Sequence, residues 1–277
     1  MSSTIIMLLC LSVIAALLCS QTDSFSISSG FKYRATDVFR SNRVAPVIST
    51  LSLNTMSTSA AVCAAPAEIE SPDISATILK SVKVTIANGE RIKLGDKIAM
   101  DRPTIVIFLR HLACPYCWSY AKEWSNFQAE IAEANISGPL FVSIGDKDKL
   151  NKFLDINPYM DRNNVFVDDY TEFSAYNALG FGRFDQTDKE VAKQVKLSSP
   201  SIGGLKAWWN YFANLNSLSP VPKGLQFGQI PEGVLRLGGT FVLSGDEVIY
   251  RWDDRLPGDH PDIKRVLEIA RGKSKKL

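Results

Sequence analysis

The sequence predicts an α/β protein with three layers, in which helices cover both faces of a central mixed sheet. Three observations support this fold class. A short apolar run over 104–109 precedes a helical pattern that carries the motif Cys114-Pro115-Tyr116-Cys117. Buried strands and helices then alternate along the chain. A β-hairpin followed by an amphipathic helix ends it, which is the element order of a compact α/β domain.

The elements of the first half follow from pattern and turn chemistry. Residues 82–86 and 91–94 alternate in polarity across Asn88-Gly89 and predict a β-hairpin. The buried strand at 104–109 leads into the motif and into a helix that is expected to run to about Asn135. Two more buried strands are expected at 140–145 and 165–169. Helices are expected over 149–156 and 172–179, and Gly180 ends the second of them.

The second half begins with an irregular stretch over 181–238 that is rich in Gly, Ser and Pro and contains one helical segment at 205–215. Residues 240–244 and 247–252 form the second hairpin, with a turn at Ser244-Gly245-Asp246. The last helix is expected from His260 to Gly272, with Pro261 at its start. With the motif directly after the first long strand, this order predicts a thioredoxin-like fold with an N-terminal hairpin and a long insertion before the last hairpin.

The first seventy residues are predicted to be a targeting segment. The apolar run over 5–18 is typical of a signal peptide, which we assign to residues 1–24. Residues 25–70 are rich in serine, poor in acidic side chains and typical of a transit peptide, so that 71–277 form the folded domain. This arrangement resembles the bipartite presequences of algae with complex plastids, and we expect a plastid location. The alternative is the secretory pathway, with a plain signal peptide and a linker.

Charge and cysteine content restrict the function. The chain has a formal charge of +2, and residues 67–277 carry equal numbers of basic and acidic side chains. This balance gives no reason to expect nucleic acid as a partner. No second apolar run follows the signal peptide, so we expect no membrane span in the mature protein. Three of the five cysteines lie in the first 66 residues, which leaves the body with a lone dithiol pair rather than a disulfide scaffold.

The spacing of the motif predicts redox chemistry. Cys114 would lie at a helix N-terminus, where free backbone N–H groups favour a thiolate. Cys117 would lie one turn further on, where it can attack a mixed disulfide formed at Cys114. Pro115 fits the first helical position, where its missing N–H costs nothing. We therefore expect Cys114 to be an exposed nucleophile and Cys117 a buried resolving partner.

Neighbouring side chains have more than one interpretation. Arg110 and His111 would lower the pKa of Cys114 if they turn toward it, and His111 is either a proton shuttle or an ordinary loop histidine. A zinc site needs two further ligands, and the body offers only His111 and His260, so we expect no metal. His260 is expected to be a helix cap or a surface residue. An aromatic cluster is expected either to pack in the core or to form the wall of an apolar substrate site; it comprises Trp208, Trp209, Tyr211 and Phe212.

Four stretches carry a resemblance to a known family, and they lie at 108–120, at 140–145, at 165–169 with 176–180, and at 237–252 with 258–260. In these stretches the chain resembles the peroxiredoxin-like 2 family, an AhpC/TSA-like group of thioredoxin-fold proteins. The resemblance implies a thioredoxin-like fold. In members with two cysteines it also implies thiol–disulfide oxidoreductase or antioxidant activity.

The chain departs from the peroxiredoxins proper. Those proteins place a proline and a hydroxyl residue before the peroxidatic cysteine, and an arginine before the late strand. Ile107, His111 and Gly238 occupy these positions here, which argues against fast direct reduction of peroxide. Gly239 takes the place of the cis-proline of thioredoxins and is followed by Thr240. We therefore group Gly239 and Thr240 with Arg110, His111, Pro115 and Tyr116 as modulators of the cysteines.

The leading hypothesis is a plastid thiol–disulfide oxidoreductase that uses Cys114 and Cys117. It needs no bound cofactor, and an external thiol donor, either thioredoxin or glutathione, would reduce it again. Its substrate would be a disulfide or a peroxide. The alternatives are a reductase of lipid peroxides or prostaglandin-type endoperoxides, a redox-switched binding protein without turnover, and a scaffold that binds an iron–sulfur cluster between two subunits.

Overall fold

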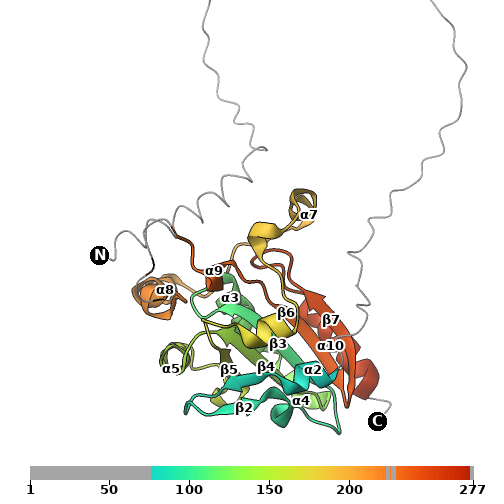
Figure 1. Cartoon of the computed structure of the whole chain (residues 1–277). Helices are drawn as coiled ribbons and strands as arrows, with labels where there is room; N and C mark the ends of the chain where they lie inside the picture. The colour runs from blue at the N-terminus through green and yellow to red at the C-terminus, as the bar shows by residue number, and fades with distance from the viewer. Residues whose placement is uncertain (1–75, 223–224, 226–228, 275–277) are drawn as a thin grey trace, which may run out of the picture. The chain divides into compact units, whose positions relative to one another are not determined.

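The computed structural model describes residues 76–222, 225 and 229–274, and its elements are labelled in Figure 1. The predicted signal peptide and the transit-like segment lie outside these residues. None of the helices within the described ranges is long and apolar enough to cross a bilayer.

Within the described residues, seven strands form a single sheet in the order β2-β1-β5-β4-β3-β6-β7. β3 and β4 are parallel, as are β4 and β5, whereas β6 runs antiparallel to β3 and pairs with β7. The predicted fold class is confirmed, because β4, β3, β6 and β7 with α3 and the last helix have the thioredoxin-like arrangement. The strands are β1 (Lys83–Thr85), β2 (Arg91–Lys93), β3 (Thr104–His111), β4 (Ser137–Ile144), β5 (Val165–Asp168), β6 (Gly239–Ser244) and β7 (Glu247–Asp253).

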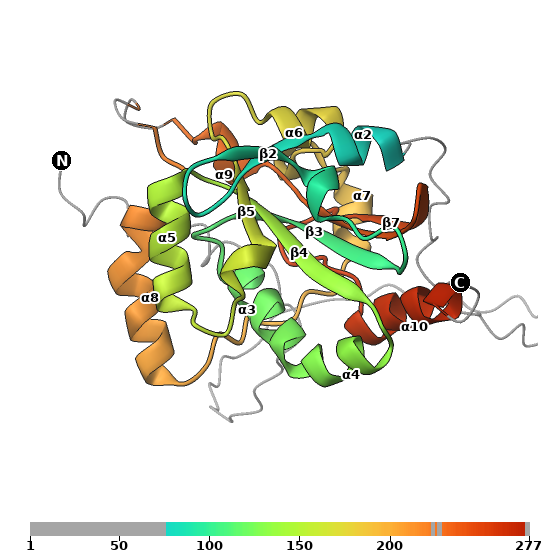
Figure 2. The same cartoon turned by 90° about the horizontal axis from the view of Figure 1, so that it is seen from below.

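Helices cover both faces of the sheet (Figures 1 and 2). α3, α5, α8 and α10 contribute to one apolar core, and α2 and α6 contribute to the core on the opposite face. The helices are α2 (Ala76–Ser81), α3 (Pro115–Trp124), α4 (Gln128–Glu133), α5 (Lys147–Ile156), α6 (Ser174–Ala178), α7 (Lys189–Gln194), α8 (Leu205–Leu218), α9 (Glu232–Leu235) and α10 (Ile263–Ser274). Single 3₁₀ turns lie at Leu94–Lys97, Ser125–Phe127, Arg162–Asn164 and Phe184–Gln186.

The central strand β3 explains the unbroken apolar run seen in the sequence. Side chains alternate between the faces of a strand. Ile105, Ile107 and Leu109 belong to the core that includes α3 and α10, and Val106 and Phe108 belong to the other core. A strand with both faces covered has a nearly continuous apolar sequence. The strand that leads into the motif is therefore packed on both sides.

Several element boundaries differ from the prediction. The helix after the motif ends at Trp124, and a 3₁₀ turn separates it from α4. The last helix begins at Ile263 rather than at His260, because the Asp262 side chain caps it and accepts from the Arg265 N–H at 2.9 Å. The irregular stretch contains α7, which is capped by the Asp188 side chain and buries none of its residues. A helix without an apolar face has no hydrophobic period to detect.

The topology gathers three segments at one edge of the sheet. β3 ends at His111, just before the motif, while the antiparallel β6 starts opposite Phe108 at Gly239. β7 ends opposite Gly239 at Asp253. Cys114, the start of β6 and the residues that follow β7 are therefore neighbours, although they are far apart in the sequence.

Candidate active site

The two cysteines flank the first turn of α3. Cys114 is the N-cap residue in extended conformation, and its N–H donates to the His111 carbonyl at 2.9 Å. Pro115 is the first helical residue, as predicted. The Cys117 sulfur lies one turn further on and accepts from the Arg110 N–H at 3.3 Å. Both sulfurs are free thiols.

The expected exposure of Cys114 is wrong. Cys114 has no solvent-exposed surface and Cys117 is 2% exposed. The insertion covers the loop before α3, because the Tyr211 hydroxyl on α8 donates to the Ala113 carbonyl at 2.9 Å. The sequence placed the insertion between two strands but did not indicate which surface it covers.

Arg110 turns toward the nucleophile. Its Nη1 lies 3.6 Å from the sulfur of Cys114. Nε donates to the Arg236 carbonyl at 3.0 Å, and Nη2 donates to the Val234 carbonyl. The guanidinium also lies over the Phe184 ring, with 5.3 Å between its carbon and the centroid. Carbonyls at α9 thus hold a permanent positive charge beside Cys114.

The environment separates the pKa values of the two thiols. Burial raises the pKa of Cys114, but hydrogen bonds from Cys117 and the charges of Arg110 and His260 outweigh it and lower the pKa to about 5. The pKa of Cys117 is raised, first by burial and then by the hydrogen bond and negative charge of Cys114. Cys114 is therefore a thiolate at neutral pH, whereas Cys117 remains a thiol.

The two histidines of the body differ in their surroundings. Burial, and then the charge of Arg110, lower the pKa of His111, so that its ring is neutral. His111 Nδ1 has no hydrogen-bond partner among the described residues. Its contribution to the site that the structure shows is the carbonyl that accepts from Cys114.

The expectation that His260 is a cap or a surface residue is wrong. Its side chain is 7% exposed, and Nδ1 lies 3.0 Å from Oδ2 of the fully buried Asp254 carboxylate. The His260 ring stacks on Tyr120 of α3 at 4.4 Å between centroids. Nothing in the local sequence marks Asp254 as a partner of His260. The pairing depends on the turn between β7 and α10, which an ion pair between Arg255 and Asp259 fixes.

The glycines at the start of β6 leave no space for side chains. A Cβ atom on Gly238 would lie 1.9 Å from the Phe108 carbonyl oxygen. An arginine at this position, as in the peroxiredoxin pattern, would not fit, and Arg110 provides the guanidinium instead. A Cβ atom on Gly239 would lie 2.4 Å from the Trp252 carbonyl oxygen. Thr240 is buried and pairs with Ile107 across the sheet.

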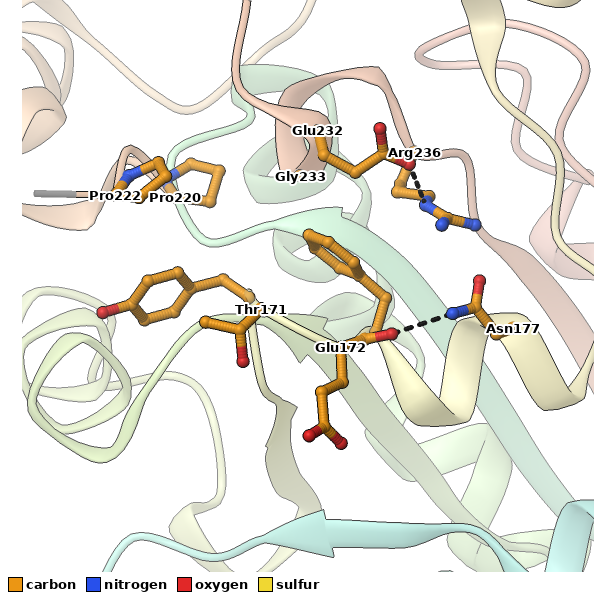
Figure 3. A pocket seen from close by; sticks show the side chains of 10 residues that line it. Thr171, Glu172, Asn177, Pro220, Pro222, Glu232, Gly233 and Arg236 are labelled. Carbon is orange, nitrogen blue, oxygen red and sulfur yellow. Dashed lines mark hydrogen bonds and ion pairs between the residues drawn. The ribbon is translucent and has the colours of Figure 1, made fainter. Parts of the chain in front are cut away.

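Two pockets lie near these elements. One of about 320 Å³ borders α3 and includes Tyr116 and His260 in its wall. The Tyr116 ring packs on Gly258, where a Cβ atom would be 2.5 Å away. The other pocket, of about 550 Å³, borders α9 and lies beside Arg236 and Glu232, which form an ion pair at 3.0 Å (Figure 3). Neither pocket includes a cysteine in its wall.

The aromatic cluster of the insertion is divided between core and surface. Tyr211 is buried and makes an edge-to-face contact with Trp118 of α3 at 5.2 Å. Trp209 and Phe212 are 79% and 42% exposed. The cluster therefore supports the motif from one side and presents aromatic surface to solvent from the other. Among the described residues, no group of three or more His, Cys, Asp or Glu side chains could hold a metal ion.

Comparison with known proteins agrees with the resemblance seen in the sequence. No family model matches the chain. A prostamide/prostaglandin F synthase of Salmo salar is 24% identical over 74% of this chain and 90% of that protein. A peroxiredoxin-like 2C protein of Bos taurus is 24% identical over 75% of this chain and 86% of that protein.

The chain resembles the peroxiredoxin-like 2 proteins. Solved structures with a loose likeness include two peroxiredoxins. Peroxidoxin BcpB of Mycobacterium tuberculosis matches at a TM-score of 0.42 and 14% identity, over 69% of this chain and 92% of that one. Peroxiredoxin Q of Xanthomonas campestris matches at a TM-score of 0.41 and 11% identity, over 72% of this chain and 93% of that one.

Proposed function

We propose that this chain is a thiol–disulfide oxidoreductase that uses Cys114 and Cys117. The observation that carries the proposal is the pair of sulfurs one helical turn apart whose pKa values move in opposite directions. A thiolate attacks a disulfide, and a nearby thiol then resolves the product. The names of the relatives, a peroxiredoxin-like protein and a prostaglandin-forming synthase, support the same class of chemistry.

The reaction proceeds in two balanced steps. The Cys114 thiolate attacks one sulfur of the substrate disulfide, which forms a mixed disulfide and releases the other sulfur as a thiol after it takes up a proton. Cys117 then attacks the sulfur of Cys114, and its proton goes to the departing substrate sulfur. The substrate disulfide is reduced to two thiols while the 114–117 pair is oxidised. An external thiol donor, thioredoxin or glutathione, returns the pair to the reduced form.

The buried position of Cys114 adds a condition to this chemistry. A substrate sulfur reaches Cys114 only when part of its cover moves. Arg110, which is held at the carbonyls of Val234 and Arg236, and Tyr211 belong to that cover. Reaction with large disulfides should therefore be slower than reaction with small ones at equal thiolate content.

A second candidate is a reductase of lipid peroxides or prostaglandin-type endoperoxides. One relative is named a prostamide/prostaglandin F synthase. The exposed Trp209 and Phe212 lie on α8, whose Tyr211 hydroxyl bonds the residue before Cys114, and they offer an aromatic surface to an apolar substrate. Trp209→Ser should lower activity on an apolar peroxide and leave activity on a small disulfide unchanged if this candidate is correct.

Steady-state turnover tests the proposal. The reduced full-length chain is given a dialkyl disulfide, a lipid hydroperoxide or an endoperoxide, with thioredoxin and its reductase or with glutathione as the donor. We expect disulfide turnover that Cys114→Ser abolishes and that Cys63→Ser, a matched change outside the motif, leaves intact. Disulfide turnover that survives Cys114→Ser would overturn the proposal. Redox-dependent binding to a partner without turnover would favour the redox-switch alternative.

We also propose a plastid location, supported by the composition of residues 1–70. A fusion of these residues to a fluorescent protein tests it in an alga with a complex plastid. Fluorescence in the plastid is the expected result, and fluorescence along the secretory route would contradict it.

A further inference from the structure

The charge of His260 helps to lower the pKa of Cys114, but the dithiol reaction described so far gives the pair of His260 and Asp254 no step of its own. The His260 side chain is 7% exposed and the Asp254 side chain is fully buried, with 3.0 Å between Nδ1 and Oδ2. Nε2 of His260 has no hydrogen-bond partner within the described ranges. An unpartnered polar atom in a buried side chain is uncommon, and a redox or catalytic role is one of its causes.

Hydrogen bonds and ring stacking connect this pair to the elements around the cysteines. Asp254 follows β7, and its N–H donates to the Gly238 carbonyl at 3.0 Å. His260 stacks on Tyr120, whose hydroxyl donates to the Pro261 carbonyl at 3.1 Å. Tyr120 lies on α3, the helix that begins at the motif. Helix α3 and the end of the sheet thus hold the imidazole from two sides.

The His260 side chain lines the polar pocket beside α3. Tyr116, which lies between the two cysteines, is part of the same wall. Burial lowers the pKa of His260, but Asp254 and then the Cys114 thiolate outweigh it, so the pKa is raised and the charged imidazolium is favoured. The other charged or titratable groups around the pair and the pocket are Arg110, Tyr120, Glu123, Lys196, Arg255, Asp259 and Asp262.

We propose that His260 is the general acid of the dithiol site and that Asp254 holds it charged and oriented. This assignment rests on the proposed function. When the Cys114 thiolate attacks a disulfide, the Cys114–substrate bond forms and the substrate S–S bond breaks. The electron pair of that bond stays on the departing sulfur, which takes the proton from Nε2 of His260. Departure of a thiol in place of a basic thiolate lowers the barrier.

A comparison of leaving groups tests the assignment. An alkyl thiolate is strongly basic and benefits from a proton donor as it leaves, whereas a nitro-substituted aryl thiolate is weakly basic and needs none. The reduced full-length chain is mixed at pH 7 with oxidised mercaptoethanol or with dithiobis-nitrobenzoate, and the rate of mixed-disulfide formation at Cys114 is measured. We expect His260→Gln to slow the alkyl reaction about 10²-fold and the aryl reaction less than about threefold. Asp254→Asn should also slow the alkyl reaction more than the aryl reaction, as His260→Gln does.

The aryl reaction also reports folding, because a misfolded variant would lose the selective reactivity of Cys114 with both probes. The variant His260→Gln/Asp254→Asn, which leaves no unpaired charge, repeats the test if His260→Gln does not fold. The matched comparison is His111→Gln, for which we expect the ratio of the two rates to stay at the wild-type value. Equal slowing of both probes, or no slowing of either, would overturn the role of His260. A Cys114→Ser variant that still reduces the substrate disulfide in steady-state turnover would overturn the proposed function instead.

The pH profile of the alkyl reaction gives a second readout, which would not change in His260→Gln if His260 had only a structural role. The alkyl reaction of the wild-type protein should fall as pH rises through the raised pKa of His260, because the imidazolium is lost. This fall should be absent in His260→Gln. Persistence of the same fall in the variant would contradict the assignment.

Discussion

Cys114 and Cys117 flank the first turn of one helix and are both buried, yet their thiols are driven to opposite protonation states. Cys114 receives a hydrogen bond from Cys117 and faces the guanidinium of Arg110. Cys117 donates that hydrogen bond and faces the resulting thiolate. Burial acts in the same direction on both, so the difference arises from charges and hydrogen bonds. The asymmetry of the site is therefore a property of its neighbours and not of solvent exposure.

The largest effect should come from exchanging each cysteine for serine. Cys114→Ser removes the nucleophile, and we expect disulfide turnover to fall by more than about 10³-fold, to the background. Cys117→Ser keeps the attack and removes the resolving thiol, so it should accumulate a mixed disulfide between Cys114 and the substrate. Intact-mass spectrometry detects this adduct. The same adduct in both variants, or in neither, would remove the distinction between the two cysteines.

A smaller effect is expected from the guanidinium. Arg110→Met removes the positive charge 3.6 Å from the Cys114 sulfur. The pKa of Cys114 should rise by ~1–2 units, and the thiolate fraction below that pKa falls about tenfold for each unit. The pH dependence of carbamidomethylation at Cys114 measures this shift. Arg110→Lys keeps the positive charge, so it should raise the pKa of Cys114 less than Arg110→Met does. A rise of equal size in the lysine variant would mean that packing, and not charge, sets the pKa.

The low pKa of Cys114 should also appear in the stability of the reduced protein. The pKa is about 5 in the folded state, compared with 9.0 for an unperturbed thiol. Between these values the unfolded state binds the extra proton, so the free energy of unfolding should rise with pH from about 5 to about 9. Urea unfolding at several pH values, with Cys114→Ser as the control, isolates this contribution. An identical pH slope in the two proteins would contradict the low pKa.

The smallest effect is expected from the cover of the site. Tyr211→Phe removes the hydroxyl that donates to the Ala113 carbonyl at 2.9 Å. We expect a loss of about 1 kcal/mol in the free energy of unfolding. Labelling of Cys114 should become faster with no change in its pKa, because the loop before α3 is held less tightly. A change of the pKa without faster labelling would show that Tyr211 acts on charge and not on access.

The fold was largely predictable because its signals are local. The apolar run of β3, the Asn88-Gly89 turn and the Ser244-Gly245-Asp246 turn each specify an element through pattern or backbone chemistry. The helix start at Pro115 was equally clear. α7 was missed, since it buries no residue and shows no hydrophobic period.

The site was predictable only in part. The two cysteines were found through their spacing, and Arg110 through its closeness in the sequence. Two features depend on long-range packing, and the sequence did not reveal them. The insertion covers Cys114, and the turn after β7 brings Asp254 and His260 behind α3. Closeness in sequence favoured His111 as the histidine of the candidate site, whereas the edge of the sheet brings His260 against Tyr120 of α3.

Site-resolved alkylation of the reduced wild-type chain tests the central claim most directly. The chain is treated with a small haloacetamide between pH 4 and pH 10, and the labelled peptides are quantified separately for each cysteine. We predict that labelling of Cys114 reaches half of its maximum near pH 5. Labelling of Cys117 should begin only above the range of an ordinary thiol. If both sulfurs titrate together near the pKa of an ordinary thiol, the opposite shifts of the two pKa values are contradicted.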